Sequence, residues 1–186
     1  LASADPPRPA DVLRVGRLAL QLHRSGPRVA LRLRDPENPV RTGFTGMRWY
    51  PPDPAWVLTA DFVAYPSPRR VTILNVLGDE LDVSSPGVAR FKVGEQALSL
   101  TAFDEGGKLW FVFTDATAGQ GTYKAARFLY ADPPRNGRVT LDFNRAENPP
   151  CAYNPFTTCP LPPRENRLPL PVPAGERDYP NRWQPR

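Results

Sequence analysis

Nine polar residues between positions 115 and 166 are of the types that bind small ligands or carry out acid/base chemistry. They are Asp115, Thr117, Tyr123, Arg127, Asp142, Asn144, Asn148, Glu165 and Asn166. Alternate residues of a strand share a face, so Asp142 and Asn144 are expected to lie side by side on the predicted strand that ends there. The same rule puts Tyr123 and Arg127 on one face of the strand predicted for residues 122–130.

We expect these groups to converge on one polar pocket if the strands that carry them are neighbours. Asp115 and Thr117 then reach it from the end of a buried strand, and Asn148, Glu165 and Asn166 reach it from the C-terminal segment. The alternative is a hydrogen-bonded network that holds this segment in place, because Asp and Asn side chains commonly bond to irregular backbone.

Three functions are compatible with these residues. The first is a non-catalytic binding or interaction domain, which the lack of recognisable catalytic machinery favours. The second is a hydrolase-like enzyme with Asp142 and Glu165 as acid and base, since burial can raise the pKa of one of two carboxyl groups. The third is an accessory subunit of a larger assembly, which the proline-rich ends suggest. The expected partner is therefore a small ligand or another protein.

Several enzyme classes lack their usual residues in this sequence. His23 is the single histidine and lies beside a predicted turn, where a solvated role is expected. The common nucleophilic triads need a positioned base, and neither a Gly-x-Ser-x-Gly elbow nor a phosphate-binding glycine-rich loop occurs. Gly119-Gln120-Gly121 lacks the third glycine and the helix of a dinucleotide motif. We therefore expect no cofactor and lean towards a protein that is not an enzyme.

Cys151 and Cys159 are the two cysteines. A disulfide between them would close a short loop and stabilise the fold by about 2.5 kcal/mol on a chain-entropy estimate. Two free thiols are the second possibility. Metal binding is the third, although a structural zinc needs four Cys or His ligands, so no metal is expected. Free thiols favour a cytoplasmic location, which we slightly prefer, and a disulfide favours an extracytoplasmic one.

The elements that must position these residues are short strands. Apolar residues alternate with polar ones along most of the chain up to Phe143, which is the period of a strand. The predicted strands cover residues 17–23, 28–34, 56–65, 71–77, 88–93, 97–103, 109–113, 122–130 and 138–143. Prolines account for 25 of the 186 residues and disfavour long helices. We predict an all-β fold, an antiparallel β-sandwich or a barrel-like domain.

Three segments follow from this pattern. Residues 1–11 are an extended lead-in, residues 12–144 are the antiparallel β domain, and residues 145–186 are a proline-rich segment packed on the sheet, with an end that frays from Arg177. No apolar run is long enough for a membrane helix, so a soluble chain is expected.

The formal net charge of +5 comes from the first 50 residues, which hold nine arginines and four acids. Arginines line one face of the hairpin predicted for residues 17–34. No aromatic residues are interleaved with them, as they are in many nucleic-acid-binding surfaces, so a nucleic-acid partner is not expected.

Several longer motifs add a family resemblance. They are GFTGMRWYP at 43–51, VLGD at 76–79, FTDATAG at 113–119, DFNRAENPPCA at 142–152, ENRL at 165–168 and AGE at 174–176. With these motifs the chain closely resembles the bacterial family catalogued as domain of unknown function 1684. The resemblance implies a shared domain over most of the chain, and it implies no established activity.

Overall fold

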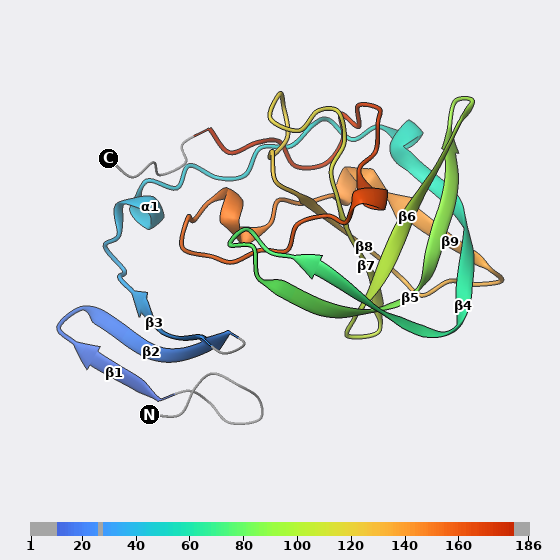
Figure 1. Ribbon diagram of the computed structural model, residues 1–186. Helices are drawn as coiled ribbons and strands as arrows, with labels where there is room; N and C mark the ends of the chain where they lie inside the picture. Colours follow the sequence, from blue (N-terminus) through green and yellow to red (C-terminus); the bar gives the residue numbers. More distant parts are fainter. Residues whose placement is uncertain (1–10, 26–27, 181–186) are drawn as a thin grey trace. The chain divides into compact units, whose positions relative to one another are not determined.

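The computed structural model describes residues 11–25 and 28–180. It divides into two units, residues 1–45 and residues 46–186, and each is described by itself. The predicted lead-in up to residue 10, the turn at Gly26-Pro27 and the chain end from residue 181 lie outside the described residues. The strands of both units are antiparallel, which confirms the predicted all-β, barrel-like fold (Figure 1).

The first unit is a three-stranded sheet in the order β1-β2-β3. Its strands are β1 (Val12–Val15), β2 (Leu18–Ser25) and β3 (Arg28–Arg34), and the short helix α1 (Pro39–Thr42) follows them. Leu20 lies opposite Leu33 and Leu22 opposite Leu31, so the leucines of the predicted hairpin share one face. Arg17 precedes β2 instead of belonging to it.

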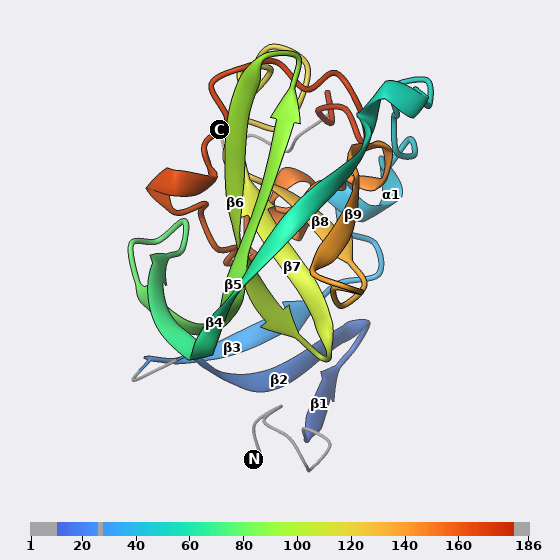
Figure 2. The ribbon, with the colours of Figure 1, turned by 90° about the vertical axis from the view of Figure 1, so that its right-hand side faces the viewer.

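The second unit contains a six-stranded sheet in the order β8-β7-β6-β5-β4-β9. Its strands are β4 (Val57–Leu74), β5 (Glu80–Val93), β6 (Gln96–Glu105), β7 (Lys108–Phe113), β8 (Arg127–Ala131) and β9 (Arg138–Asp142). β8 and β9 lie at opposite ends of this order and still contact each other. The sheet therefore curls into a half-barrel (Figure 2).

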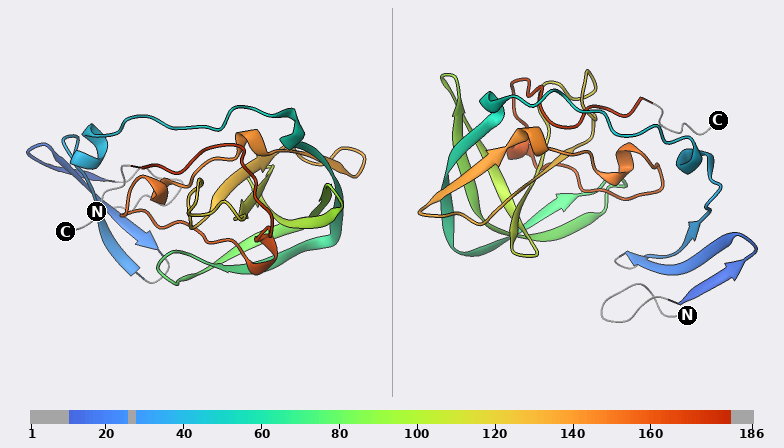
Figure 3. Two further views of the ribbon diagram at one scale, coloured as in Figure 1. Left: turned by 90° about the horizontal axis from the view of Figure 1, so that it is seen from above. Right: turned by 180° about the vertical axis from the view of Figure 1, so that it is seen from behind.

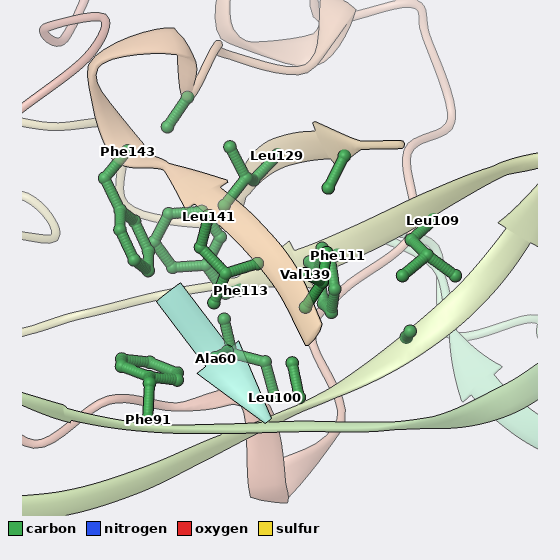
Figure 4. Close-up of a cluster of buried hydrophobic side chains, with 14 of the residues drawn as sticks. Ala60, Phe91, Leu100, Leu109, Phe111, Phe113, Leu129, Val139, Leu141 and Phe143 are labelled. Atoms are coloured by element: carbon green, nitrogen blue, oxygen red, sulfur yellow. The ribbon is translucent and has the colours of Figure 1, made fainter. Parts of the chain in front are cut away.

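Aromatic and aliphatic side chains fill the inside of the curled sheet (Figure 4). Phe111 and Phe113 of β7 are fully buried, as predicted for a central strand. The ring of Phe113 packs edge-on against Phe143, with the centroids 5.5 Å apart. Each such side chain contributes about 1.5–3 kcal/mol when it leaves water, so this cluster is what holds the strands in a common layer.

β4 is one long strand where the sequence predicts two, at 56–65 and 71–77. Its register with β5 shifts between Ala64 and Arg69, and this irregularity contains Pro66 and Pro68. Proline lacks the N–H that a regular ladder requires, but a bulge tolerates it. The prolines therefore interrupt the pairing without ending the strand.

The strand predicted at 122–130 is shorter, because β8 begins at Arg127. Residues 114–126 form a loop whose turns use backbone bonds such as Gly119 N–H to Thr122 O. Tyr123 therefore does not share a strand face with Arg127, and that part of the prediction is wrong. Thr122 bonds within the loop instead of pairing with a strand.

The C-terminal segment lies alongside the strands of the second unit (Figure 3). It includes the 3-10 helices η3 (Pro150–Ala152) and η4 (Arg164–Asn166). Leu168 N–H donates to Thr114 O at 2.8 Å, and Ala116 N–H donates to Leu170 O at 3.1 Å. The backbone of Arg177 also bonds to Arg48 O at 2.7 Å, so the chain is still ordered where fraying is predicted to begin.

Among residues 11–25 and 28–180, no helix is both long and apolar enough to cross a membrane.

Candidate functional site

Asp115 and Arg127 form a buried ion pair inside the second unit. Arg127 Nη2 lies 2.6 Å from Asp115 Oδ2, and the two side chains are 0% and 1% exposed. The guanidinium also lies over the ring of Phe113, 4.8 Å from its centroid. Burial lowers the pKa of Arg127, and the charge of Asp115 opposes that shift. The pair is sealed from solvent, so it offers no surface to a ligand.

Both members of this pair hold the C-terminal segment. Arg127 Nη1 donates to Ala174 O at 2.5 Å, and Nη2 donates to Val172 O at 3.1 Å. Val172 N–H donates to Asp115 Oδ1 at 3.0 Å. Thr117 donates to the same oxygen through its N–H and its hydroxyl. Asp115, Thr117 and Arg127 come together as predicted, and their contacts are those of the tail-holding network.

Asn166 makes the same kind of connection from η4. Its Nδ2 donates to Thr101 O and to Val112 O, both at 2.9 Å, and its Oδ1 accepts from Thr101 N–H at 2.7 Å. Asn166 is fully buried. The amide therefore joins the tail to β6 and β7 and makes no hydrogen bond to Asp115 or Arg127 among the described residues. Its neighbour Glu165 is exposed and joins neither group.

Asn148 bonds to a carboxylate that the sequence does not single out, Glu176. Asn148 N–H donates to Glu176 Oε2 at 2.8 Å, and Asn148 Nδ2 donates to Arg177 O at 2.8 Å. Glu176 is buried, and burial raises its pKa while Asn148 partly opposes the rise. Gly175 before it has φ of 78° and would place a Cβ 2.5 Å from Ala146 O, so only glycine fits there.

Replacing Glu176 with Gln is expected to flatten the dependence of stability on pH. A carboxyl with a pKa above its unfolded value binds its proton more tightly in the folded chain. Its stabilising effect is full below the ordinary glutamate pKa of about 4.3 and is lost as pH rises through the folded pKa. Urea unfolding between pH 4 and 8 measures this decline, with Glu165→Gln as the exposed control. If the free energies of unfolding of the wild type and Glu176→Gln changed in parallel with pH, the raised pKa of Glu176 would be contradicted.

Asp142 and Asn144 meet, but not on one strand face as predicted. β9 ends at Asp142, and Asn144 lies in the 3-10 helix η2 (Phe143–Arg145). Asp142 Oδ1 caps this helix by accepting from Asn144 N–H at 3.1 Å and from Asn144 Nδ2 at 3.0 Å. Asn144 also exchanges two hydrogen bonds with the backbone of Asp53. Both polar atoms of the Asn144 side chain are thus hydrogen-bonded, and these bonds fix the position of Arg145 in η2.

Cys151 and Cys159 lie next to each other as free thiols. Cys151 N–H donates to Cys159 Sγ at 3.2 Å, and Tyr123 OH donates to Cys151 O at 3.2 Å. The side-chain hydrogen bond between the two cysteines lowers the pKa of Cys159 to about 7, and the same side-chain bond raises the pKa of Cys151. Tyr123 thus bonds to the backbone of the cysteine loop.

Oxidised glutathione is expected to convert this pair into a disulfide, because the thiolate is the form that attacks a disulfide sulfur. The intact mass should fall by about two daltons as two hydrogens leave, and the free energy of unfolding should rise by about 2.5 kcal/mol. Cys151→Ser is the control and should show neither change. A folded chain that keeps its mass while the urea-unfolded chain oxidises would contradict this prediction.

A pocket opens to solvent where η2 meets β8. It has a volume of about 260 Å³ and is lined by Trp49, Tyr130, Asn144, Arg145 and Glu147. Trp49 is 44% exposed and Tyr130 is 37% exposed. Asn144 alone of these five is among the sequence candidates. The motifs at 43–51 and 142–152 contain three of the other four residues, but only the fold brings Tyr130 beside them.

The two charged side chains in this pocket have no ion-pair partner among the described residues. Partial burial raises the pKa of Glu147. Burial also raises the pKa of Tyr130, and the charge of Glu147 adds to that rise. Within the described ranges, neither Arg145 nor Glu147 has an ion-pair partner. A cation and a carboxylate therefore face one small space beside two aromatic rings.

A second cavity, of about 390 Å³, lies between the β4 bulge, the β6–β7 turn and the loop after β8. Apolar groups such as Phe62, Tyr65 and Pro133 dominate its lining. It contains none of the candidate residues. Neither Asp142 nor Glu165 lines either of these two cavities. In the part of the chain that the structure describes, no three His, Cys, Asp or Glu side chains gather closely enough to hold a metal.

Comparisons with known proteins support the domain and bring no activity. A family model described as "Protein of unknown function (DUF1684)" matches residues 42–177. The chain is similar to an uncharacterised protein of Haloarcula marismortui whose solution structure was determined by NMR. The sequence identity is 33% and the TM-score 0.61, over 74% of this chain and 78% of that chain. A search of curated proteins found no match.

Proposed function

The chain belongs to the DUF1684 family of proteins of unknown function, and from the geometry of its pocket we propose that it is a non-catalytic domain that binds a small ligand. The site is the pocket lined by Trp49, Tyr130, Asn144, Arg145 and Glu147, called the aromatic pocket below. The observation that carries the proposal is the meeting, in one concave space, of two exposed aromatic rings with two charges that have no ion-pair partner in residues 11–25 and 28–180. Ligand sites combine these features, an apolar lining and a few placed polar groups.

The pocket is held by hydrogen bonds that do not use its two aromatic rings or its two charged groups. Glu147 and Phe128 exchange two backbone hydrogen bonds of 2.9 Å. Trp49 forms a backbone bridge with Glu176. Asn144 anchors η2 through Asp53. A site held in this way loses little conformational entropy when a ligand binds, which favours affinity.

The remaining candidates support a structural role beside this site. Asp115 and Arg127 bond to the C-terminal segment, and Thr117 bonds to Asp115. Asn166, itself in that segment, bonds to β6 and β7. The hydrolase alternative gains no support, because Asp142 caps η2 and Glu165 is exposed on another element. The network thus holds the segment, and Glu176 of this segment bonds to Ala146 and Asn148 on either side of Glu147 and bridges to Trp49.

Saturation-transfer NMR on the full chain with mixtures of small polar metabolites tests this proposal. We expect a subset of the mixture to bind the wild type and to lose binding in Trp49→Ala. The matched control is Phe156→Ala, which removes an aromatic ring that is 71% exposed and lies outside the pocket. Binding that is equal in the wild type and Trp49→Ala would contradict the aromatic pocket as the site.

A further inference from the structure

The aromatic pocket presents charges of both signs beside aromatic faces, and we propose that its ligand is a small zwitterion with an ammonium group and a carboxylate or phosphate group. This inference rests on the proposed function, because it names the chemical class that the same pocket takes. The charges that carry it are those of Arg145 and Glu147, which line the pocket together with Trp49 and Tyr130.

The ammonium half of the ligand is recognised by Glu147 and the two rings. Aromatic faces attract cations through their quadrupole, and tryptophan is the strongest of them. Trp49 and Tyr130 both leave part of their surface open to the pocket, and Tyr130 is backed by Trp110, whose ring is stacked at 6.5 Å with an interplanar angle of 13°. A bound cation would also supply the partner that the partly desolvated Glu147 carboxylate lacks among the described residues.

The anionic half is recognised by Arg145. A guanidinium binds carboxylates and phosphates through two parallel hydrogen bonds. Arg145 is the last residue of η2, a 3-10 helix that Asp142 caps. It is exposed, and the structure gives it no carboxylate partner within the described ranges. Arg127 of β8 is buried and bonds to Asp115, Val172 and Ala174, so it cannot take this role.

A ligand with only one charge would leave the other pocket charge unmatched. A simple cation would satisfy Glu147 and bring a second positive charge close to Arg145. A simple anion would satisfy Arg145 and be repelled by Glu147. A zwitterion meets both requirements in a pocket of about 260 Å³, which also restricts the ligand to a small molecule or a small head group.

Isothermal titration calorimetry on the full chain, with phosphocholine, choline and inorganic phosphate as probes, tests this class. Phosphocholine is expected to bind about tenfold or more tightly than choline or phosphate, the gain from one added charge-assisted contact. Arg145→Gln should remove the advantage of phosphocholine over choline. Glu147→Gln should weaken both. The matched controls Arg164→Gln and Glu165→Gln change exposed residues of η4 and should leave all affinities unchanged.

The outcomes separate this inference from the proposed function. Equal affinities for phosphocholine and choline, or an Arg145→Gln variant that keeps the preference, would overturn the zwitterion. If neutral metabolites bind in a Trp49-dependent way and phosphocholine does not, the pocket stands and the ligand class is wrong. If the binding of every probe and metabolite is independent of Trp49, the proposed function itself is wrong. A phosphocholine group could belong to a lipid or to a soluble molecule, and sedimentation with phosphatidylcholine vesicles distinguishes them. Binding to vesicles indicates a lipid head group, and binding only to free phosphocholine indicates a soluble ligand.

Discussion

Replacing Arg127 with Met is expected to lower the free energy of unfolding by about 3–5 kcal/mol, as the removal of one partner from a buried ion pair does. The Asp115 carboxylate would remain 1% exposed without its cation. The carbonyls of Val172 and Ala174 would lose their hydrogen bonds from this guanidinium at the same time. Urea unfolding followed by tryptophan fluorescence measures the loss, and limited proteolysis shows whether the C-terminal segment detaches first.

The matched control for this variant is Arg138→Met. Arg138 also belongs to a strand and faces a carboxylate, Asp61, but these side chains are 71% and 80% exposed and 3.9 Å apart. Exposed pairs of this kind contribute about 0–1 kcal/mol. If Arg127→Met cost no more than Arg138→Met, the tail-holding role of the buried pair would be wrong.

A double variant separates charge from packing. Arg127→Met combined with Asp115→Leu removes both charges, and buried pairs can often be replaced by apolar residues at little cost. We expect the double variant to lose less stability than the sum of the two single variants, because the residues are in contact. A loss equal to that sum would mean that the two side chains act independently.

Asn166→Ala is expected to lower the free energy of unfolding by about 3 kcal/mol. The change leaves the N–H and C=O of Thr101 and the C=O of Val112 without their partner, and each buried polar group left unpaired costs about 1–3 kcal/mol before relaxation. Urea unfolding measures the total. Hydrogen exchange at the Thr101 amide measures the local effect, which should be a loss of protection.

Glu165→Ala is the control for Asn166→Ala, because it changes the adjacent exposed residue of the same 3-10 helix. Its effect should stay within about 0.5 kcal/mol, the usual range for a surface substitution. A Thr101 amide that stays equally protected in Asn166→Ala would contradict the bridge between η4 and the sheet.

The local pattern of side chains is enough to predict much of the fold. Alternation predicts the strands at 17–23 and 28–34 of the first hairpin, which correspond to β2 and β3. The apolar run 109–113 predicts a buried strand. The same alternation does not predict that β4 is one strand. Its two prolines indicate a break, and the pairing across them depends on the partner strand.

The candidate site follows less well from the sequence, because it depends on contacts between distant residues. The polar types at Asp115 and Arg127 are visible, but their bonds to Val172 and Ala174 arise only when the tail folds back. The sequence around Tyr130 does not indicate a ligand-binding residue, since Tyr130 is an outward-facing residue of an otherwise buried strand. The division at residue 144 into a β domain and a packed segment stays a prediction.

Titration of the ¹⁵N-labelled full chain with phosphocholine tests whether the aromatic pocket is the binding site, because each tryptophan indole N–H gives its own NMR signal. We expect the signal of Trp49 to shift as phosphocholine is added and to reach a plateau at saturation. The signal of Trp56, which packs against the core, should stay in place. A Trp49 signal that does not move while phosphocholine perturbs residues elsewhere would contradict the aromatic pocket as the binding site.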